Sequence, residues 1–221
     1  MKESRKSKIE LCFIVFGIIV GIVGILHGCA ELLKGSALIQ SHSVEALPYN
    51  WPNSEFYTLM KGAPVFSLLI DIPHYVLGLL AVSISVALIV FSANFFKLNF
   101  KGILLFALLS VGIYLFGAGE GTPIAISFPL VIFGTILLLS PKKKERKTST
   151  KRMISYGFIV FYVLQISSWV LFFPGLFVLS FYQEIPQWLF LFDFMIMPVS
   201  ILGAGIFGLL FDKTLEGVKL E

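Results

Sequence analysis

Three ionisable side chains share one face of the first apolar stretch of the chain. His27, Glu31 and Lys34 stand at positions i, i+4 and i+7, a spacing that brings them together on a helix. Ionisable groups near membrane depth are costly and are usually paired. One interpretation is an intrahelical hydrogen bond between His27 and Glu31. The other is a metal or proton site, because a histidine and a carboxylate four residues apart can ligate one ion, although a metal needs two further ligands.

Further polar residues are expected at the same outer end. Asp71 and His74 lie at the entry to the second long apolar stretch, and Glu120 lies in an outer turn. Asp193 lies about six residues into the last stretch, roughly 9 Å below its outer end. The candidate polar site therefore comprises His27, Glu31, Asp71, His74, Asp193 and Glu120, and a bound metal would use His27, Glu31, Asp71 and His74. The sequence itself identifies no cofactor.

Each of these residues also has a structural interpretation. Asp71 is of a type that caps helices well. Glu120 fits ordinary solvent exposure. Asp193 fits a structural hydrogen bond to a neighbouring helix, as does the polar patch of Gln165, Ser167, Ser168 and Trp169.

Four glycines in the first apolar stretch form a stripe. Gly17, Gly21, Gly24 and Gly28 recur at spacings of four, three and four. Small residues allow close approach of helix backbones in lipid, where the hydrophobic effect does not drive association. The stripe predicts a helix–helix packing face.

Six apolar stretches must position these residues. Transmembrane helices are predicted at about 9–33, 74–96, 102–118, 124–140, 154–181 and 187–211. Residues 64–72 are apolar but too short to span, and they predict a short interfacial or re-entrant helix. Pro174 and Pro198 interrupt the last two helices.

Composition and charge support a membrane protein. Hydrophobic residues make up 57% of the 221 residues, with a mean hydropathy of +0.91. Fifteen of the 17 Lys and Arg residues fall in segments on one side of the predicted bilayer, and only Lys34 and Lys61 fall on the other. This asymmetry predicts that both termini are cytoplasmic. It also explains the net charge of +4 without a nucleic-acid partner.

The predicted fold is an all-α polytopic bundle of six transmembrane helices in the cell membrane. It is one membrane domain over 1–221. Within it, 9–140 is a four-helix unit with an outer loop at 35–72, 141–152 is a basic cytoplasmic loop, and 153–212 is a helical hairpin. The basic residues at 142–152 are expected to attract anionic lipid at about 1 kcal/mol each. A second copy of the chain or another membrane protein is left open as a partner.

The pattern Gly21-x-x-Gly24-x-x-His27-Gly28-x-x-Glu31 followed by Gly35 resembles the first helix of a group of small multi-pass membrane proteins of prokaryotes, often archaea. The likeness covers about residues 10–140. It is more distantly similar to the four-helix DoxX-like proteins, which lack the last two helices. The resemblance implies no activity, but it marks His27 and Glu31 for testing.

Three functions remain open from the sequence. The leading hypothesis is a non-enzymatic membrane protein that binds a small molecule or lipid, or supports a partner, from the outer-leaflet side. The second is a membrane-embedded metalloenzyme that uses the outer His and carboxylate residues. The third is a small transporter with Asp193 as its proton or cation site.

Overall fold

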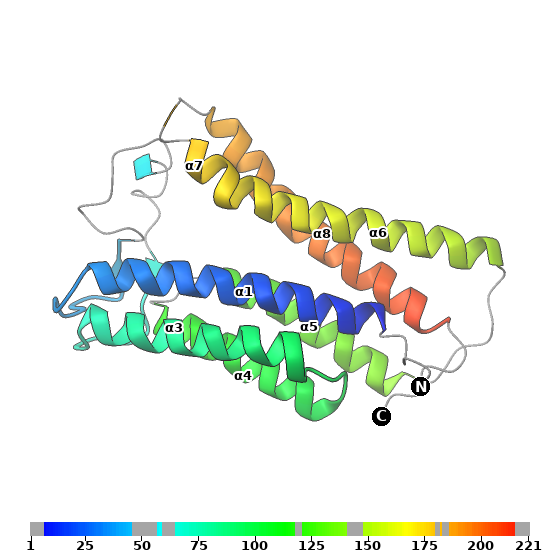
Figure 1. Ribbon diagram of the computed structural model, residues 1–221, viewed down its shortest axis with the longest axis horizontal. Helices are drawn as coiled ribbons and strands as arrows, with labels where there is room; N and C mark the ends of the chain where they lie inside the picture. The colour runs from blue at the N-terminus through cyan, green and yellow to red at the C-terminus, as the bar shows by residue number, and fades with distance from the viewer. Residues whose placement is uncertain are drawn as a thin grey trace.

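Long apolar helices form most of the chain that the computed structural model describes, which is residues 7–45, 57–58, 65–117, 121–140, 148–179, 182 and 186–214 (Figure 1). The helices are α1 (Lys8–Leu33), α3 (His74–Val90), α4 (Phe100–Phe116), α5 (Thr122–Leu139), α6 (Thr148–Val170), α7 (Phe177–Leu179) and α8 (Gln187–Asp212). Two π-helical segments extend them: η1 (Phe91–Phe95) continues α3, and η2 (Leu171–Leu176) joins α6 to α7.

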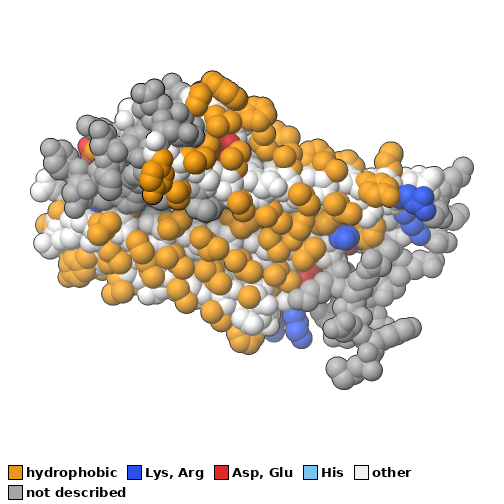
Figure 2. Space-filling model, turned by 45° about the horizontal axis from the view of Figure 1, so that its top comes forward, with side chains coloured by type: hydrophobic (Ala, Val, Ile, Leu, Met, Phe, Trp, Pro, Cys, Tyr) orange, Lys and Arg blue, Asp and Glu red, His pale blue; other side chains and the backbone are white. Residues whose placement is uncertain are grey.

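Five of the helices are long and apolar enough to cross a membrane: α1, α3 with η1, α5, α6 and α8. α4 is apolar as well but has only 17 residues. Apolar side chains cover the visible outer surface of the helices, and most visible Lys and Arg side chains gather toward one end (Figure 2). A soluble protein rarely exposes so large an apolar surface, whereas lipid accommodates it. The architecture is that of a helical membrane protein.

α1 runs through the middle of the bundle. Its most extensive contact is with α3, and it also touches α5 and α8. α4 lies against α3 and α5, while α6 and α8 pair with each other (Figure 1). In the core, the ring of Phe13 stacks on Phe96 with centroids 4.6 Å apart and meets Phe106 edge-on at 4.8 Å.

The glycine stripe of α1 lies in the interface with α3. Gly17, Gly21, Gly24 and Gly28 are all buried. A Cβ atom at Gly21 would lie 2.9 Å from the carbonyl oxygen of Ser85, and one at Gly28 would lie 3.0 Å from that of Gly78. The two backbones therefore approach too closely for larger side chains.

The two ends of the described chain meet at one end of the bundle, which we call the terminal end. Asp212 at the end of α8 accepts hydrogen bonds from the backbone N–H groups of Lys8 and Ile9, each at 2.8 Å. These are among the donors that the first turn of α1 leaves unpaired, and an anionic acceptor there is favourable. Asp212 thus fixes the start of α1 against the end of α8, a role that the sequence analysis did not predict.

The opposite end, which we call the loop end, contains a short β-ribbon. β1 (Ser43–Val44) pairs antiparallel with β2 (Val65–Phe66), and Leu38 bridges Pro73. The predicted short helix at 64–72 is therefore wrong for the described residues 65–72. Their backbone groups bond across to the chain that leaves α1, for example Ser67 N–H to the His42 carbonyl at 2.7 Å. This cross-strand pairing satisfies the backbone without a helix.

The helix pair α6–α8 inclines away from α1 toward the loop end (Figure 1).

α6 begins at Thr148, inside the segment predicted as a basic loop, and the rest of that loop at 141–147 lies outside the described residues. Pro174 lies in η2, so the chain continues past the proline as π-helix. Proline removes a backbone donor, and π-helical geometry at such a position is common near functional sites.

Candidate functional site

Glu31 is fully buried near the loop end of α1 and uses both carboxylate oxygens. Oε1 accepts a hydrogen bond from Lys34 Nζ at 2.5 Å, and Oε2 lies 2.5 Å from His74 Nδ1. Lys34 Nζ also donates to the carbonyl oxygen of Glu45 at 2.7 Å. One carboxylate therefore ties together α1, the start of α3 and the loop that carries Glu45.

His27 adjoins this group on α1. Its Nε2 lies 3.7 Å from Glu31 Oε1, within ion-pair range but too far for a hydrogen bond, and this buried atom has no hydrogen-bond partner among the described residues. The ring packs beside Gly117 at the end of α4. The structure thus brings His27, Glu31 and His74 together, with Lys34 as a further member. We call these four residues the Glu31 cluster.

Asp71 does not join the Glu31 cluster. It is exposed, its φ is 59°, and its backbone N–H bonds to the Ile39 carbonyl at 2.8 Å. It does not cap α3 either, because the cap residue of that helix is Pro73, without a side-chain hydrogen bond. Glu120 lies outside the described residues.

The metal set predicted from the sequence, His27, Glu31, Asp71 and His74, is not assembled. Within the described ranges, no three His, Cys, Asp or Glu side chains are arranged to hold a metal ion. The physical reason is that Lys34 and His74 already occupy both oxygens of Glu31, while Asp71 faces outward on the loop.

A second polar group lies between α6 and α8. Asp193 of α8 is 1% exposed, and its Oδ1 accepts a hydrogen bond from Ser168 of α6 at 2.6 Å. Its other oxygen, Oδ2, is buried and has no hydrogen-bond partner in the described part of the chain. No hydrogen bond or ion pair joins Asp193 to the Glu31 cluster among the described residues.

Two buried donors on α6 are unpaired as well. Trp169 Nε1 and Gln165 Nε2 lack partners among the described residues, although Gln165 Oε1 accepts a hydrogen bond from Ser200 of α8. Gln165, Ser168 and Trp169 stand at i, i+3 and i+4, on one side of α6. Asp193 and Ser200 stand seven residues apart on α8. The Ser168–Asp193 and Gln165–Ser200 hydrogen bonds therefore connect α6 and α8 at two successive levels. We call Gln165, Ser168, Trp169, Asp193 and Ser200 the hairpin cluster.

An aromatic pair lies on the loop-end side of the hairpin cluster. Phe172 follows Ser168 by four residues on the α6 side, and Phe190 precedes Asp193 by three on α8. Their rings meet edge to face, with centroids 6.3 Å apart. Along the helix axes, Phe172 and Phe190 therefore lie about one turn from Ser168 and Asp193, toward the loop end.

The sequence predicted a polar patch on the fifth helix, which includes Gln165, Ser168 and Trp169, and a buried Asp193 on the sixth. It did not predict the pairing of Ser168 with Asp193 or the part played by Ser200. The signal was present, because Ser200 lies two turns from Asp193 on one stripe of α8. Spacing could not show that one oxygen of Asp193 would stay unpaired.

Comparison of the chain with known protein families, with curated proteins and with solved structures gives no match. Function must therefore be inferred from the geometry of the site.

Proposed function

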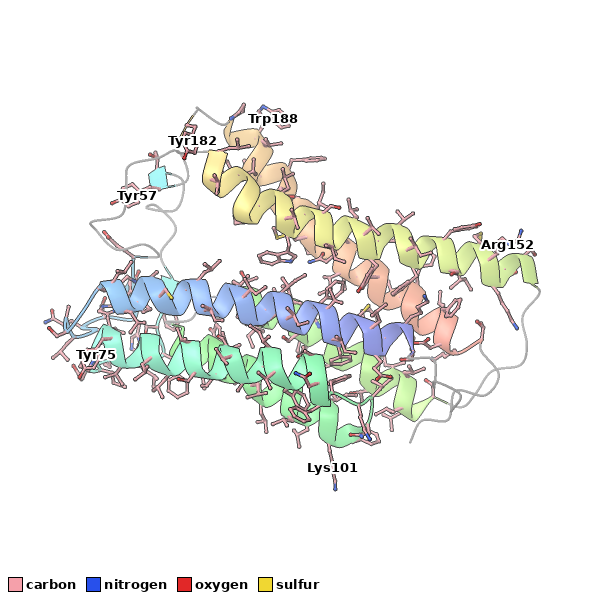
Figure 3. All side chains as sticks on the ribbon, viewed as in Figure 1. Tyr57, Tyr75, Lys101, Arg152, Tyr182 and Trp188 are labelled. Carbon is pink, nitrogen blue, oxygen red and sulfur yellow. The ribbon has the colours of Figure 1, made fainter. Side chains whose placement is uncertain are left out.

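We propose that the protein is a six-span integral membrane protein with both termini in the cytoplasm. α4 completes the six, since its 17 residues extend about 25 Å, the lower limit for a spanning helix. Lys101 and Arg152 point away from the bundle at the terminal end, whereas Tyr57, Tyr75, Tyr182 and Trp188 lie toward the loop end (Figure 3). Basic residues favour the cytoplasmic side, and exposed aromatic residues favour a membrane interface. Anionic lipid is expected at the basic segment 142–152.

Its function, in this proposal, is to bind a small polar molecule or a lipid headgroup at the hairpin cluster, reached from the outer-leaflet side. The observation that carries the proposal is a set of three buried atoms of the hairpin cluster that have no hydrogen-bond partner among the described residues: Asp193 Oδ2, Trp169 Nε1 and Gln165 Nε2. A buried polar group left unpaired costs about 1–3 kcal/mol. A ligand that supplies a donor to Asp193 and acceptors to the other two would remove these costs together.

The Glu31 cluster does not carry this proposal, because its carboxylate oxygens are already paired. Its chemistry suits a structural clamp that holds the loop end of α1 to α3. The two carboxylates therefore have different roles: among the described residues, both oxygens of Glu31 are paired, whereas Oδ2 of Asp193 is not.

Transport of a cation or proton is the second candidate. Asp193 is an acidic residue inside a spanning helix, and such residues mark ion and substrate pathways by default. The helices on either side of it are irregular, with η2 after α6 and Pro198 inside α8. Broken helices often form transporter sites. Both functions, binding alone and transport, would use Asp193. Measurement of cation or proton flux across reconstituted vesicles distinguishes them.

Native mass spectrometry of the protein purified in mild detergent tests binding. We expect a bound small molecule or lipid on the parent protein, and loss of at least tenfold of that occupancy in Asp193→Asn and in Trp169→Phe, since each removes one hydrogen bond to the ligand. Asp71→Asn is the matched control, because it makes the same carboxylate-to-amide change on an exposed loop and should keep the ligand. A parent protein without any bound species, or one whose bound species is unchanged in both variants, contradicts the proposal.

A further inference from the structure

We infer that the ligand of the hairpin cluster carries a primary ammonium group beside an oxygen acceptor, as in an ethanolamine unit. The inference rests on the proposed binding function and names the chemistry of its ligand. Such a group occurs both in free small amines and in the headgroup of ethanolamine lipids.

The first reason is the uncompensated carboxylate. In the described part of the chain, no Lys, Arg or His side chain forms a salt bridge with Asp193, and Ser168 is the one side chain that donates a hydrogen bond to it. A carboxylate at this depth is costly unless it is paired. A cation that also donates a hydrogen bond to Oδ2 would neutralise the negative charge of Asp193 and would satisfy the free lone pair of that oxygen.

The second reason is the aromatic surrounding. Trp169 neighbours Ser168 on α6, and the edge-to-face pair of Phe172 and Phe190 stands on the loop-end side of Asp193. Aromatic faces attract ammonium groups, most strongly where water is excluded. Trp169 is 7% exposed and Asp193 is 1% exposed, so the cluster is shielded from water.

The third reason concerns the rest of the ligand. Trp169 Nε1 and Gln165 Nε2 are both donors, and they need acceptors rather than further N–H groups. They stand four residues apart, roughly 6 Å along α6. A hydroxyl or phosphate oxygen a few bonds from the ammonium group would meet one or both of them. A ligand with an ammonium group alone would leave both donors unpaired.

A thermal unfolding experiment on the full chain tests the inference with named probes. In delipidated protein in detergent, ethanolamine at saturation should raise the unfolding temperature by about 5 °C. Ethylene glycol, in which a hydroxyl replaces the ammonium group, should give no shift. Choline, whose nitrogen cannot donate a hydrogen bond, should bind about tenfold more weakly.

A lipid arm separates the two sources of the ammonium group. The same protein is placed in nanodiscs of phosphatidylethanolamine or phosphatidylglycerol with identical acyl chains. Stabilisation by phosphatidylethanolamine without an effect of free ethanolamine assigns a lipid headgroup, and stabilisation by free ethanolamine assigns a small amine. In either arm Asp193→Asn should abolish the shift, Trp169→Phe should reduce it, and Asp71→Asn should keep it.

The inference is overturned if neither ethanolamine nor phosphatidylethanolamine stabilises the protein, or if ethylene glycol stabilises it equally. Persistence of the shift in a folded Asp193→Asn protein overturns it as well. These outcomes leave the proposed binding function standing if the bound species found by mass spectrometry still depends on Asp193, so the two failures can be told apart.

Discussion

At the scale of single residues, Glu31 and Asp193 show two opposite states of a buried carboxylate. Glu31 is 0% exposed and has a partner on each oxygen, Lys34 and His74. Asp193 is 1% exposed, and within the described part of the chain it has a hydrogen-bond partner on only one oxygen. A saturated carboxylate contributes to holding the fold, whereas an unsaturated one costs free energy until something binds it.

Glu31→Gln should therefore destabilise the protein strongly. It leaves Lys34 and His74 without their carboxylate, and breaking a buried pair in this way lowers the free energy of unfolding by about 3 kcal/mol. Denaturant unfolding in detergent measures it. Asp71→Asn should stay within about 0.5 kcal/mol of the parent, because the residue is exposed and asparagine tolerates its positive φ. Equal stability of the two variants would show that Glu31 is not a clamp.

The side-by-side placement of His27, Glu31 and Lys34 could be predicted from the sequence because helical spacing is local. The contact between Glu31 and His74 could be predicted as well. The two residues are expected at the same depth in the membrane, and consecutive helices are commonly neighbours. The position of Asp71 could not be predicted. It depends on a left-handed backbone conformation and on pairing with Ile39, and neither leaves a periodic signal.

At the scale of elements, the α1–α3 interface depends on backbone contact. Gly21 faces the Ser85 carbonyl oxygen, a backbone atom that cannot move aside as a flexible side chain can. Gly112 of α4 offers a contrast, because a Cβ atom there would meet only side-chain carbons of Ile84 at 3.3 Å.

Gly21→Ala should lower the unfolding temperature in detergent, and Gly112→Ala should not. Both changes add the same methyl group and the same gain in helix propensity, about 1 kcal/mol. Only Gly21→Ala also forces the helices apart, at a cost of about 1–3 kcal/mol. If the two variants have the same unfolding temperature, α1 and α3 are less closely packed than in the structure.

The helices themselves could be predicted from apolar length, and the ribbon at the loop end could not. Residues 65–72 are apolar like the spanning stretches, so their hydropathy indicated a helix. Their backbone bonds go instead to residues 39–44, which segment 45–64 separates from them in the chain. Pairing across such a distance is a tertiary effect that outweighs local propensity.

At the scale of the whole molecule, the proposed topology places the terminal end in the cytoplasm and the loop end outside. Both clusters then lie toward the outer half, and the hairpin cluster lies on the helix pair that inclines away from α1 (Figure 1). A ligand from the outer leaflet would reach Asp193 past Phe172 and Phe190.

Cysteine labelling in intact cells checks this topology. In a chain with Cys12 and Cys29 replaced by alanine, Ser41→Cys should react with an impermeant maleimide from outside. Lys101→Cys and Arg152→Cys should react only after the membrane is permeabilised. All three positions are exposed, so access depends on the side of the membrane alone. Outside labelling of Lys101→Cys or Arg152→Cys, with Ser41→Cys protected, would invert the topology.

The most direct test of the central claim is an experimental density map of the purified protein in nanodiscs, at a resolution that shows ordered waters. The claim is that the hairpin cluster holds a ligand. It predicts non-protein density larger than a water molecule, within about 3.2 Å of Asp193 Oδ2 and also in contact with Trp169 Nε1 or Gln165 Nε2. A map in which Asp193 Oδ2 bonds to another side chain of the protein, or faces only a water molecule, would contradict it.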